Sequence, residues 1–415
     1  MVVLVPQYVL LPTQQEMWIK MILPTIPVSE YEMRKIAIQN LMGKYNFDIL
    51  FFFGDDRAVF GANHTRWISN YAPHFEPILI AIPRIGDIHA ATGAESEAFF
   101  NNTAKIGTVH VVDEFNMPEE EYPYTKSKSF TDFCDVLNQE LNGRAINVGI
   151  VGESSIPVWL HSLIHEAGYS IEASDAFEIA YRLLRASKSD AEVEVLKYGF
   201  KIAEAGFDAG FNALREGVSE RDVAAEIEYT MRKLGSEGSG IDTIVGFGQA
   251  NTFPILTRTT HNKLKSKDLA LLTIAPRYEG YHGVIARPIV VGQPIPEVKK
   301  AIEGAIKASA ASAEQLRVGA RGSDISGAGL EVLRREQLID LCVYSGIHSV
   351  GTSEFEPPIL TSKSDFIVPN NFFVSIDVPL FFANWGGLRV ETGYLVSQDS
   401  VQRLSSTTLQ YLEIS

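Results

Sequence analysis

A helix start near the middle of the chain constrains the fold more than any other sequence feature. The segment Ser189-Asp-Ala-Glu192 has the pattern of a capping box, in which two polar side chains satisfy free N–H groups at the start of a helix. A long amphipathic helix is predicted to follow through about Leu214 and to end before Gly217. Because 415 residues are too many for one ordinary core, we expect a domain boundary in front of this helix, within Glu172–Ser189.

Residues 1–172 are predicted to form an α/β domain. Apolar residues at helical spacing indicate a helix from Tyr31 to Lys44, and the apolar run Asp48–Phe53 that follows has the composition of a short strand. Alternation of such strands with helices is typical of a sheet flanked by helices. Further strands are predicted at Pro77–Ile82, Val109–Val112 and Asn147–Val151.

Residues 173–415 are predicted to form an α+β domain. A second helix begins at Ser219-Glu-Arg-Asp222 and ends at Gly235, which has the residue type of a C-cap. Strands, two later helices and more strands follow, so the order helix–helix–strands occurs twice and suggests a duplicated unit. The strands are predicted at Asp242–Gly246, Leu269–Ala275 and Tyr281–Val291, and the later helices at Glu297–Leu316 and from Ser323 onward.

Charge and hydropathy exclude several classes of partner. Acidic residues outnumber basic ones by 51 to 36, for a formal net charge of −15, and no concentrated Lys/Arg run is present. Nucleic-acid binding needs such a basic surface, so no nucleic-acid partner is expected. No apolar run reaches the roughly eighteen residues of a membrane span. The short apolar segment Met1–Leu11 lacks the basic flank of a signal peptide, and we expect no membrane association.

The two cysteines, Cys134 and Cys342, are far apart in the sequence and belong to different predicted domains. A disulfide framework or a thiolate zinc site is therefore not expected. Such sparse cysteine usage suits a reducing compartment, and we expect a cytoplasmic protein.

Short motifs in the second half carry a family resemblance. They are Leu183–Leu196, Lys263–Thr273, Tyr281–Gly292, Ile347–Gly351 with Glu356–Pro358, and Trp385–Glu391. In this order, they resemble the landmarks of the creatinase/prolidase family, and Arg66–Tyr71 in the first half resembles part of that family's smaller N-terminal domain. The resemblance covers about Leu183 to Gln398. It implies the pita-bread (creatinase/aminopeptidase) fold for the second domain, hydrolysis of a C–N bond, and a homodimer.

The resemblance also implies a two-metal site built from two aspartates, one histidine and two glutamates, but this chain matches only part of it. His348 matches the histidine and Glu391 the last glutamate, while Asp377 replaces the first glutamate. The two aspartate positions fall at Thr273 and Val284, which supply no carboxylate. One imidazole and two carboxylates can hold a single Mn, Zn or Fe ion with water in the open positions. We therefore expect either one divalent metal or none.

Each of these residues also has a structural interpretation. A lone histidine is more often a hydrogen-bonded structural residue than a ligand, although the matched motif favours a functional role for His348. Glu391 can instead pair with Arg389 or Arg287, and Asp377 can be a strand-end residue without a role.

The chain also departs from creatinase, a member of the resembled family that works without a metal. The position of its histidine base falls at Ile255, and that of a nearby glutamate falls at Ala286. His282 is the candidate replacement for the base, because alternation along a strand would place it on one face with Val284. The other interpretation is that His282 faces solvent, as we expect for His261 in its polar turn.

Four further residues are candidates for substrate binding. Arg287 is a candidate partner for a substrate carboxylate, and Thr273 and Asn251 belong to the segments of the vacated ligand and base positions. The family's dimers imply that Arg66 could reach the cleft of a neighbouring subunit.

The leading hypothesis is a cytoplasmic hydrolase that cleaves a C–N bond in a small molecule or short peptide, such as an Xaa-Pro peptide or an amidine-type compound. His348, Asp377, Glu391 and His282 are its candidate catalytic residues. The alternative is a catalytically silent protein that binds a peptide or metabolite in the former active-site cleft. Loss of both aspartates favours the alternative, whereas retention of the His/Asp/Glu trio favours the enzyme.

Overall fold

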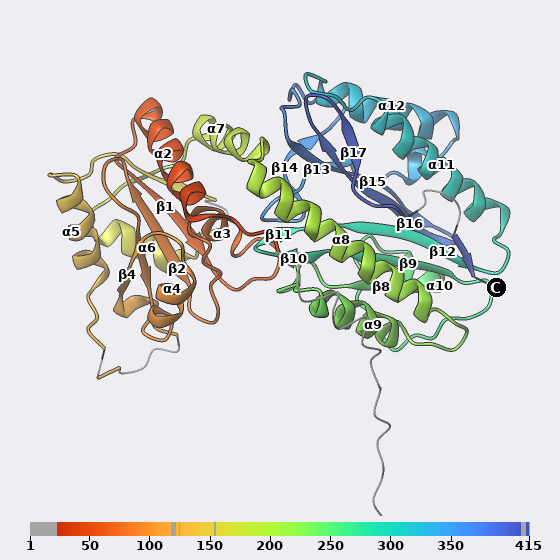
Figure 1. Ribbon diagram of the computed structural model, residues 1–415, viewed down its shortest axis with the longest axis horizontal. Helices are drawn as coiled ribbons and strands as arrows, with labels where there is room; N and C mark the ends of the chain where they lie inside the picture. Colours follow the sequence, from red (N-terminus) through yellow and green to blue (C-terminus); the bar gives the residue numbers. More distant parts are fainter. Residues whose placement is uncertain (1–22, 118–121, 124, 153–154, 408–411, 415) are drawn as a thin grey trace, which may run out of the picture.

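The chain forms an α/β domain and a larger α+β domain, with helix α7 (Asp175–Ala186) between them (Figure 1). This is the fold class predicted from the sequence; the exact boundary at residue 172 stays a prediction. No helix in the described ranges is long and apolar enough to cross a membrane. The segment Met1–Leu11, for which no signal peptide is predicted, lies outside those ranges. This computed structural model describes residues 23–117, 122–123, 125–152, 155–407 and 412–414.

A six-stranded sheet forms the first domain, in the order β4-β3-β2-β1-β5-β6. Its inner strand β1 is buried along its whole length and pairs antiparallel with β2 and parallel with β5. Burial on both faces explains why this strand is a continuous apolar run in the sequence. The strands are β1 (Ile49–Gly54), β2 (Ile78–Pro83), β3 (His89–Thr92), β4 (Thr108–Val111), β5 (Val148–Val151) and β6 (Ile171–Glu172).

Helices pack against both faces of this sheet. Alternate side chains of β1 enter different cores: Leu50 and Phe52 belong to the core that contains α2, and Phe51 to the core that contains α5 and α6. The helix predicted from Tyr31 to Lys44 is α2. The helices of this domain are α2 (Val28–Tyr45), α3 (Asn63–Ser69), α4 (Glu97–Thr103), α5 (Phe130–Glu140) and α6 (Val158–Glu166).

The second domain is built on a long, mainly antiparallel sheet, whose strands run in the order β14-β13-β15-β16-β12-β9-β8, with β17 beside β16 and β18 beside β12. A small sheet, β11-β10-β7, lies next to the first domain (Figure 1). The strands are β7 (Gly238–Ser239), β8 (Ile244–Phe247), β9 (Leu269–Ile274), β10 (Pro276–Tyr278), β11 (Tyr281–His282), β12 (Ile285–Val291), β13 (Gly346–Ser349), β14 (Glu356–Leu360), β15 (Phe372–Ala383), β16 (Gly386–Val396), β17 (Val401–Arg403) and β18 (Leu412–Ile414).

Two helix pairs accompany this sheet. Helices α8 and α9 pack together next to β8 and β9, and α11 packs on α12 and on β15 and β16 (Figure 1). Each pair precedes a group of strands, so the predicted order of helix–helix–strands, twice over, is present. The helices are α8 (Asp190–Ala213), α9 (Glu220–Lys233), α10 (Gly248–Thr252), α11 (Pro296–Ala313) and α12 (Gly322–Arg335).

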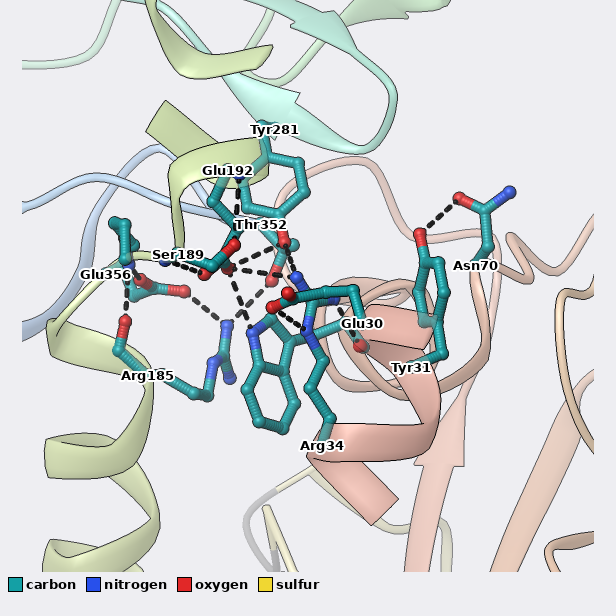
Figure 2. A network of polar contacts seen from close by, with 12 residues as sticks. Glu30, Tyr31, Arg34, Asn70, Arg185, Ser189, Glu192, Tyr281, Thr352 and Glu356 are labelled. Atoms are coloured by element: carbon teal, nitrogen blue, oxygen red, sulfur yellow. Dashed lines mark hydrogen bonds and ion pairs between the residues drawn. The ribbon is translucent and has the colours of Figure 1, made fainter. Parts of the chain in front are cut away.

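The predicted capping box at the start of α8 is confirmed, and it also joins the two domains (Figure 2). The Ser189 hydroxyl accepts the Glu192 N–H at 3.2 Å, and the Ser189 N–H donates to Glu192 Oε2 at 2.9 Å. The other carboxylate oxygen accepts from the Trp67 indole at 3.2 Å and from the Tyr281 hydroxyl at 2.8 Å, and it lies 3.3 Å from the Arg34 guanidinium. Glu192 thus connects α2, α3, α8 and β11.

One predicted strand, Tyr281–Val291, is broken in the structure into β11 and β12. Helix α8 packs against the break, where a Cβ at Gly283 would lie 2.2 Å from the carbonyl oxygen of Gly199. This close approach needs a residue without a side chain, so Gly283 marks a contact that the strand pattern did not reveal.

Arg34 is the buried cation of this interdomain network, and its replacement is expected to destabilise the chain. It donates to Glu30 at 3.2 Å and pairs with Glu192, so Arg34→Met leaves two buried carboxylates without their cation. Removal of one partner from a buried ion pair costs about 3–5 kcal/mol. Urea unfolding is expected to show a loss of that size. Arg335→Met, which breaks an exposed pair with Glu331, is the control and is expected to cost less than about 1 kcal/mol; equal losses would contradict the account.

Candidate active site

The register of the long sheet collects polar residues on one face. Directly paired residues of neighbouring strands point to the same side, and so do residues two apart on one strand. His348 of β13 is two residues from Gly346, so it faces the side to which the paired Asp377 and Glu391 point. The three predicted centre residues are therefore brought to one face of three adjacent strands. The paired row runs through Thr273, Ala286, Glu391, Asp377 and Gly346, and His348 lies two residues from Gly346 along β13.

His348 is held in one orientation by the backbone. Its Nδ1 lies 2.9 Å from the Ser349 carbonyl, which can only accept, so Nδ1 carries the proton and Nε2 faces the carboxylates. Nε2 is 3.6 Å from Glu391 Oε1 and 3.7 Å from Glu354 Oε1. Burial alone would lower the pKa of His348, but the adjacent carboxylate of Glu391, followed by the charge of Glu354, outweighs it and raises the pKa to about 9.

Glu354 is the functional candidate that the sequence motifs did not reveal. It lies in the loop between β13 and β14, is buried, and has its pKa raised to about 7, first by burial. Among the residues that the structure describes, His348, Glu354 and Glu391 are the group whose ligand atoms all lie within 4.8 Å of one another. The available signal was an acidic residue six positions after His348, between the matched segments Ile347–Gly351 and Glu356–Pro358.

Asp377 lies in the same polar centre, but its carboxylate is engaged elsewhere. The Tyr344 hydroxyl donates to Asp377 Oδ2 at 2.6 Å, and the Arg389 Nε lies 3.8 Å from the same oxygen. Asp377 is therefore not part of the three-residue group, in which Glu354 stands instead. Aspartate is one methylene shorter than glutamate, which is consistent with Asp377 not reaching the point where the other three side chains meet.

Arg389 supplies a positive charge within the polar centre. It is buried, its Nη2 donates to the Tyr344 hydroxyl at 3.0 Å, and its guanidinium lies over the Phe381 ring at 5.5 Å. Arg389 is two residues from Glu391 on β16 and so points to the same face. It partly balances the carboxylates of Glu354, Asp377 and Glu391.

The polar centre is closed in this structure. His348, Glu354, Asp377 and Glu391 are each at most 7% exposed. The Phe355 ring lies against His348, with ring centroids 4.2 Å apart. Entry of any substrate therefore requires a side chain such as Phe355 to move.

The two positions where the resemblance expects aspartates hold no ligand. Thr273 is fully buried in the row that contains Glu391, and its hydroxyl has no hydrogen-bond partner within the described ranges. Val284 is buried in the apolar core that includes Leu272 and Phe200. Neither side chain can contribute a carboxylate to a second metal.

His282 does not follow the alternation on which its prediction depended, because β11 ends at His282 and β12 begins only at Ile285. Its Nδ1 lies 3.1 Å from the Gly351 carbonyl. Its ring packs over Gly240, where a Cβ would lie 2.0 Å from His282 Cδ2. Burial lowers its pKa to about 4. A catalytic role for His282 stays a prediction; the geometry shows a neutral, enclosed imidazole.

Arg287 corrects a second expectation. It follows Ala286 on β12, so its side chain points to the face opposite the Glu391 carboxylate. There it donates to the Glu391 backbone carbonyl and, at 2.9 Å, to the Thr392 hydroxyl. The buried guanidinium thus joins β12 to β16, and it is not positioned to bind a substrate at the polar centre.

The remaining two substrate-binding candidates have partners within the chain. The Asn251 amide donates to both oxygens of buried Glu220, at 2.8 and 3.0 Å. Arg66 donates to Glu237 of the second domain at 2.6 Å and to the Asn70 carbonyl at 2.9 Å. Both contacts are structural, so substrate binding by either residue stays a prediction.

Comparison with protein families and with curated proteins gives consistent results. Residues 194–398 match metallopeptidase family M24. The chain is 24% identical over 331 residues to the Xaa-Pro dipeptidase of Pyrococcus furiosus, which covers 76% of this chain and 92% of that protein.

Solved structures share the fold. The prolidase of Pyrococcus horikoshii superposes with a TM-score of 0.75 at 21% identity, covering 90% of this chain and 98% of that one. The X-Pro aminopeptidase of Thermotoga maritima gives a TM-score of 0.77 at 19% identity, covering 92% and 99%. At these identities the likeness establishes the fold alone.

Thr273 offers a test of the vacated position. Its buried hydroxyl lacks a partner in the described part of the chain, so Thr273→Val is expected to leave the free energy of unfolding within about 1 kcal/mol of the parent. Thr273→Asp puts an unpaired carboxylate in the same row as Glu391 and is expected to cost several kcal/mol, on the order of a buried unpaired charge. Urea unfolding measures both. A large loss in Thr273→Val would contradict the assignment of an idle position.

Proposed function

The chain belongs to the creatinase/prolidase family of pita-bread proteins, and from that premise we propose that it is a hydrolase with a single-metal centre. In this proposal His348, Glu354 and Glu391 hold one divalent ion, and the substrate is a small peptide whose C–N bond is cleaved. The observation that carries the proposal is the convergence of one imidazole and two carboxylates on a common point.

The donor geometry supports one ion. Tetrahedral ligands at about 2.1 Å from a metal lie about 3.4 Å from each other. The distances from His348 Nε2 to Glu354 and Glu391, 3.7 and 3.6 Å, are close to that value. His348 donates its Nδ1–H to the Ser349 carbonyl. A metal-binding histidine commonly makes such a hydrogen bond with the ring nitrogen that does not bind the metal. Mn²⁺, Zn²⁺ and Fe²⁺ all accept imidazole and carboxylate ligands.

The chain's own residues have defined roles in this proposal. A bound divalent ion would supply Lewis-acid polarisation of a carbonyl and a more acidic water. Arg389 holds Asp377 beside the ligand set and offsets part of its negative charge. Ser375 donates to Glu391 Oε1 at 2.8 Å and fixes that carboxylate. Phe355, against His348, excludes water when the site is closed.

The choice of substrate rests on the relatives. The protein of Pyrococcus furiosus that aligns over 92% of its length is an Xaa-Pro dipeptidase. An Xaa-Pro dipeptide is therefore the first substrate class that we propose; amidine-type compounds, which the creatinase resemblance suggests, are the second. We also propose that the chain is a cytoplasmic homodimer, in agreement with two free cysteines and with the family resemblance.

A catalytically silent binding protein is the second candidate. Two observations favour it: Thr273 and Val284 remove the ligands of a second metal, and Arg389 already provides a cation beside Asp377. In this candidate the closed centre is structural, and the chain binds its peptide or metabolite without cleaving it.

Metal stoichiometry tests the single-metal centre. After equilibration with Mn²⁺, Zn²⁺ or Fe²⁺ and gel filtration, elemental analysis is expected to find about one ion per chain. His348→Ala and Glu354→Gln are expected to lose the ion, because each removes one of three protein ligands. The exposed His261, changed to alanine, is the matched control and is expected to retain it. Two ions per chain, or none with any metal, would refute the proposal.

Hydrolysis assays separate the two candidate functions. The metal-loaded chain is expected to release proline from Met-Pro or Leu-Pro, and Glu354→Gln is expected to reduce kcat/KM by about 10²-fold or more, because it weakens the Lewis acid. Glu331→Gln, at an exposed site on α12, is the control and is expected to be unchanged. A chain that binds metal yet cleaves none of these peptides would instead support the silent binding protein.

A further inference from the structure

A cavity of about 380 Å³ lies between the two domains, apart from the residues of the polar centre. Its size is within the range of small-molecule sites. The first domain contributes its wall from the end of β1 to the start of α3, helix α7 contributes a row of charged side chains, and β14 closes the far side. The lining includes Phe53, Phe60, His64, Arg182, Arg185, Ser353, Phe355 and Ile359.

Two buried cations lie beside this cavity. Arg185 and Lys188 both pair with the carboxylate of Glu356, with Lys188 Nζ at 2.8 Å, and all three side chains are at most 5% exposed. Figure 2 shows Arg185 between Glu356 and Thr352, to whose hydroxyl it donates at 2.7 Å. Two cations face one carboxylate here, whereas Arg34 in the adjoining part of the network faces two, Glu30 and Glu192. The network is balanced as a whole, and its cation Arg185 lies on the side of the cavity, where an anion can approach it.

His64 faces this cluster from the first domain and adds no charge to it. His64 Nδ1 lies 3.2 Å from an Arg185 Nη1 and 3.2 Å from the Tyr181 hydroxyl. Since a guanidinium can only donate, His64 Nδ1 accepts and the proton is on Nε2. Burial, followed by the charge of Arg185, lowers the pKa of His64, so the ring is neutral. Its Nε2 is on the side of Gly152, which also lines the cavity.

At the rim, the other charged side chains are already paired. Arg182 lies 3.4 Å from Glu178 on the same helix, and Arg57 lies 2.6 Å from Asp55. The rim is therefore neutral overall, and the half-exposed Arg182 is its cation that lines the cavity beside Arg185.

Unpartnered polar atoms and apolar rings complete the walls. Arg185 Nε and Ser353 Oγ, both on buried residues that line the cavity, have no hydrogen-bond partner in the described part of the chain. Buried polar groups normally have hydrogen-bond partners, so the simplest explanation for these two atoms is a ligand that binds in the cavity and contacts them. The rest of the wall is apolar and includes Phe53, Phe60, Phe355 and Ile359.

We propose that this interdomain cavity binds a small organic anion that carries one carboxylate on an apolar body. The Arg185 guanidinium, with its unpartnered Nε, matches a carboxylate, and the apolar walls do not suit inorganic phosphate. The phenylalanine and isoleucine side chains match an aromatic or branched apolar group. Phe355 separates the cavity from His348, so the binding site does not depend on the proposed metal centre.

Calorimetric titration of the full-length chain tests the ligand class. Phenylacetate represents a free organic acid, and N-acetylphenylalanine represents the carboxyl end of a peptide. At least one of them is expected to bind saturably with one site per chain. The tighter of the two shows whether the natural ligand is a free acid or a peptide end. Phenylacetamide, which lacks the charge, and inorganic phosphate, which lacks the apolar body, are expected to bind at least about tenfold more weakly. Equal binding of the acid and its amide, or tighter binding of phosphate, would overturn the proposal, as would binding of neither acid.

Substitutions locate the site. Arg182→Gln leaves Glu178 without its cation at the rim and is expected to weaken the acid about tenfold, the effect of one charged hydrogen bond. Arg335→Gln on α12 breaks an equivalent exposed pair with Glu331 and is expected to have no effect. Arg185→Lys keeps the charge but removes Nε and is expected to weaken binding further; if that variant does not fold, Arg182→Gln decides. Unchanged affinity in Arg182→Gln would overturn the proposed location.

Discussion

The strand register of the long sheet is the constraint on which the polar centre depends. Pairing of Ala286 with Glu391, and of Glu391 with Asp377, sets one row of side chains across adjacent strands. A slip of one residue would turn the row to the opposite face. Helix α11 and β16 contribute to the core below, which buries Val390 and Val378 beside these polar residues. The same register thus fixes both the apolar core and the polar site.

Electrostatic balance explains how a centre without the resembled family's full ligand set can remain folded. Glu354, Asp377 and Glu391 are buried carboxylates, and an unpaired buried charge is strongly destabilising. Arg389 and His348 supply positive charge beside them. The proposed divalent ion would occupy the one point on which His348, Glu354 and Glu391 converge, while Arg389 serves Asp377. This division of roles explains why Glu391 on β16 lies beside His348, whereas Asp377 on β15 lies beside Arg389.

Much of the fold could be predicted because its signals are local. The capping box at Ser189–Glu192 and the apolar run of β1 depend on residues close in sequence. The placement of His348 near Glu391 required the family resemblance, since pairing of distant strands has no local signature. Glu354 was missed because a loop side chain takes its position from tertiary contacts. The expectation for Arg287 was wrong, although side-chain alternation along a strand could have corrected it. Arg287 is next to Ala286 on β12, and Ala286 belongs to the row, so the Arg287 side chain points to the opposite face.

X-ray absorption spectroscopy of the zinc-loaded chain tests the central claim most directly, because it reports the ligands around the ion itself. The account predicts one histidine nitrogen and carboxylate or water oxygens at about 2.0–2.2 Å. It also predicts the absence of a second metal in the outer shell, and loss of the bound zinc, and with it of the histidine signal, in His348→Ala. A metal–metal distance of about 3.5–4 Å, as in a two-metal centre, would contradict it. So would a bound ion that retains its histidine ligand in His348→Ala.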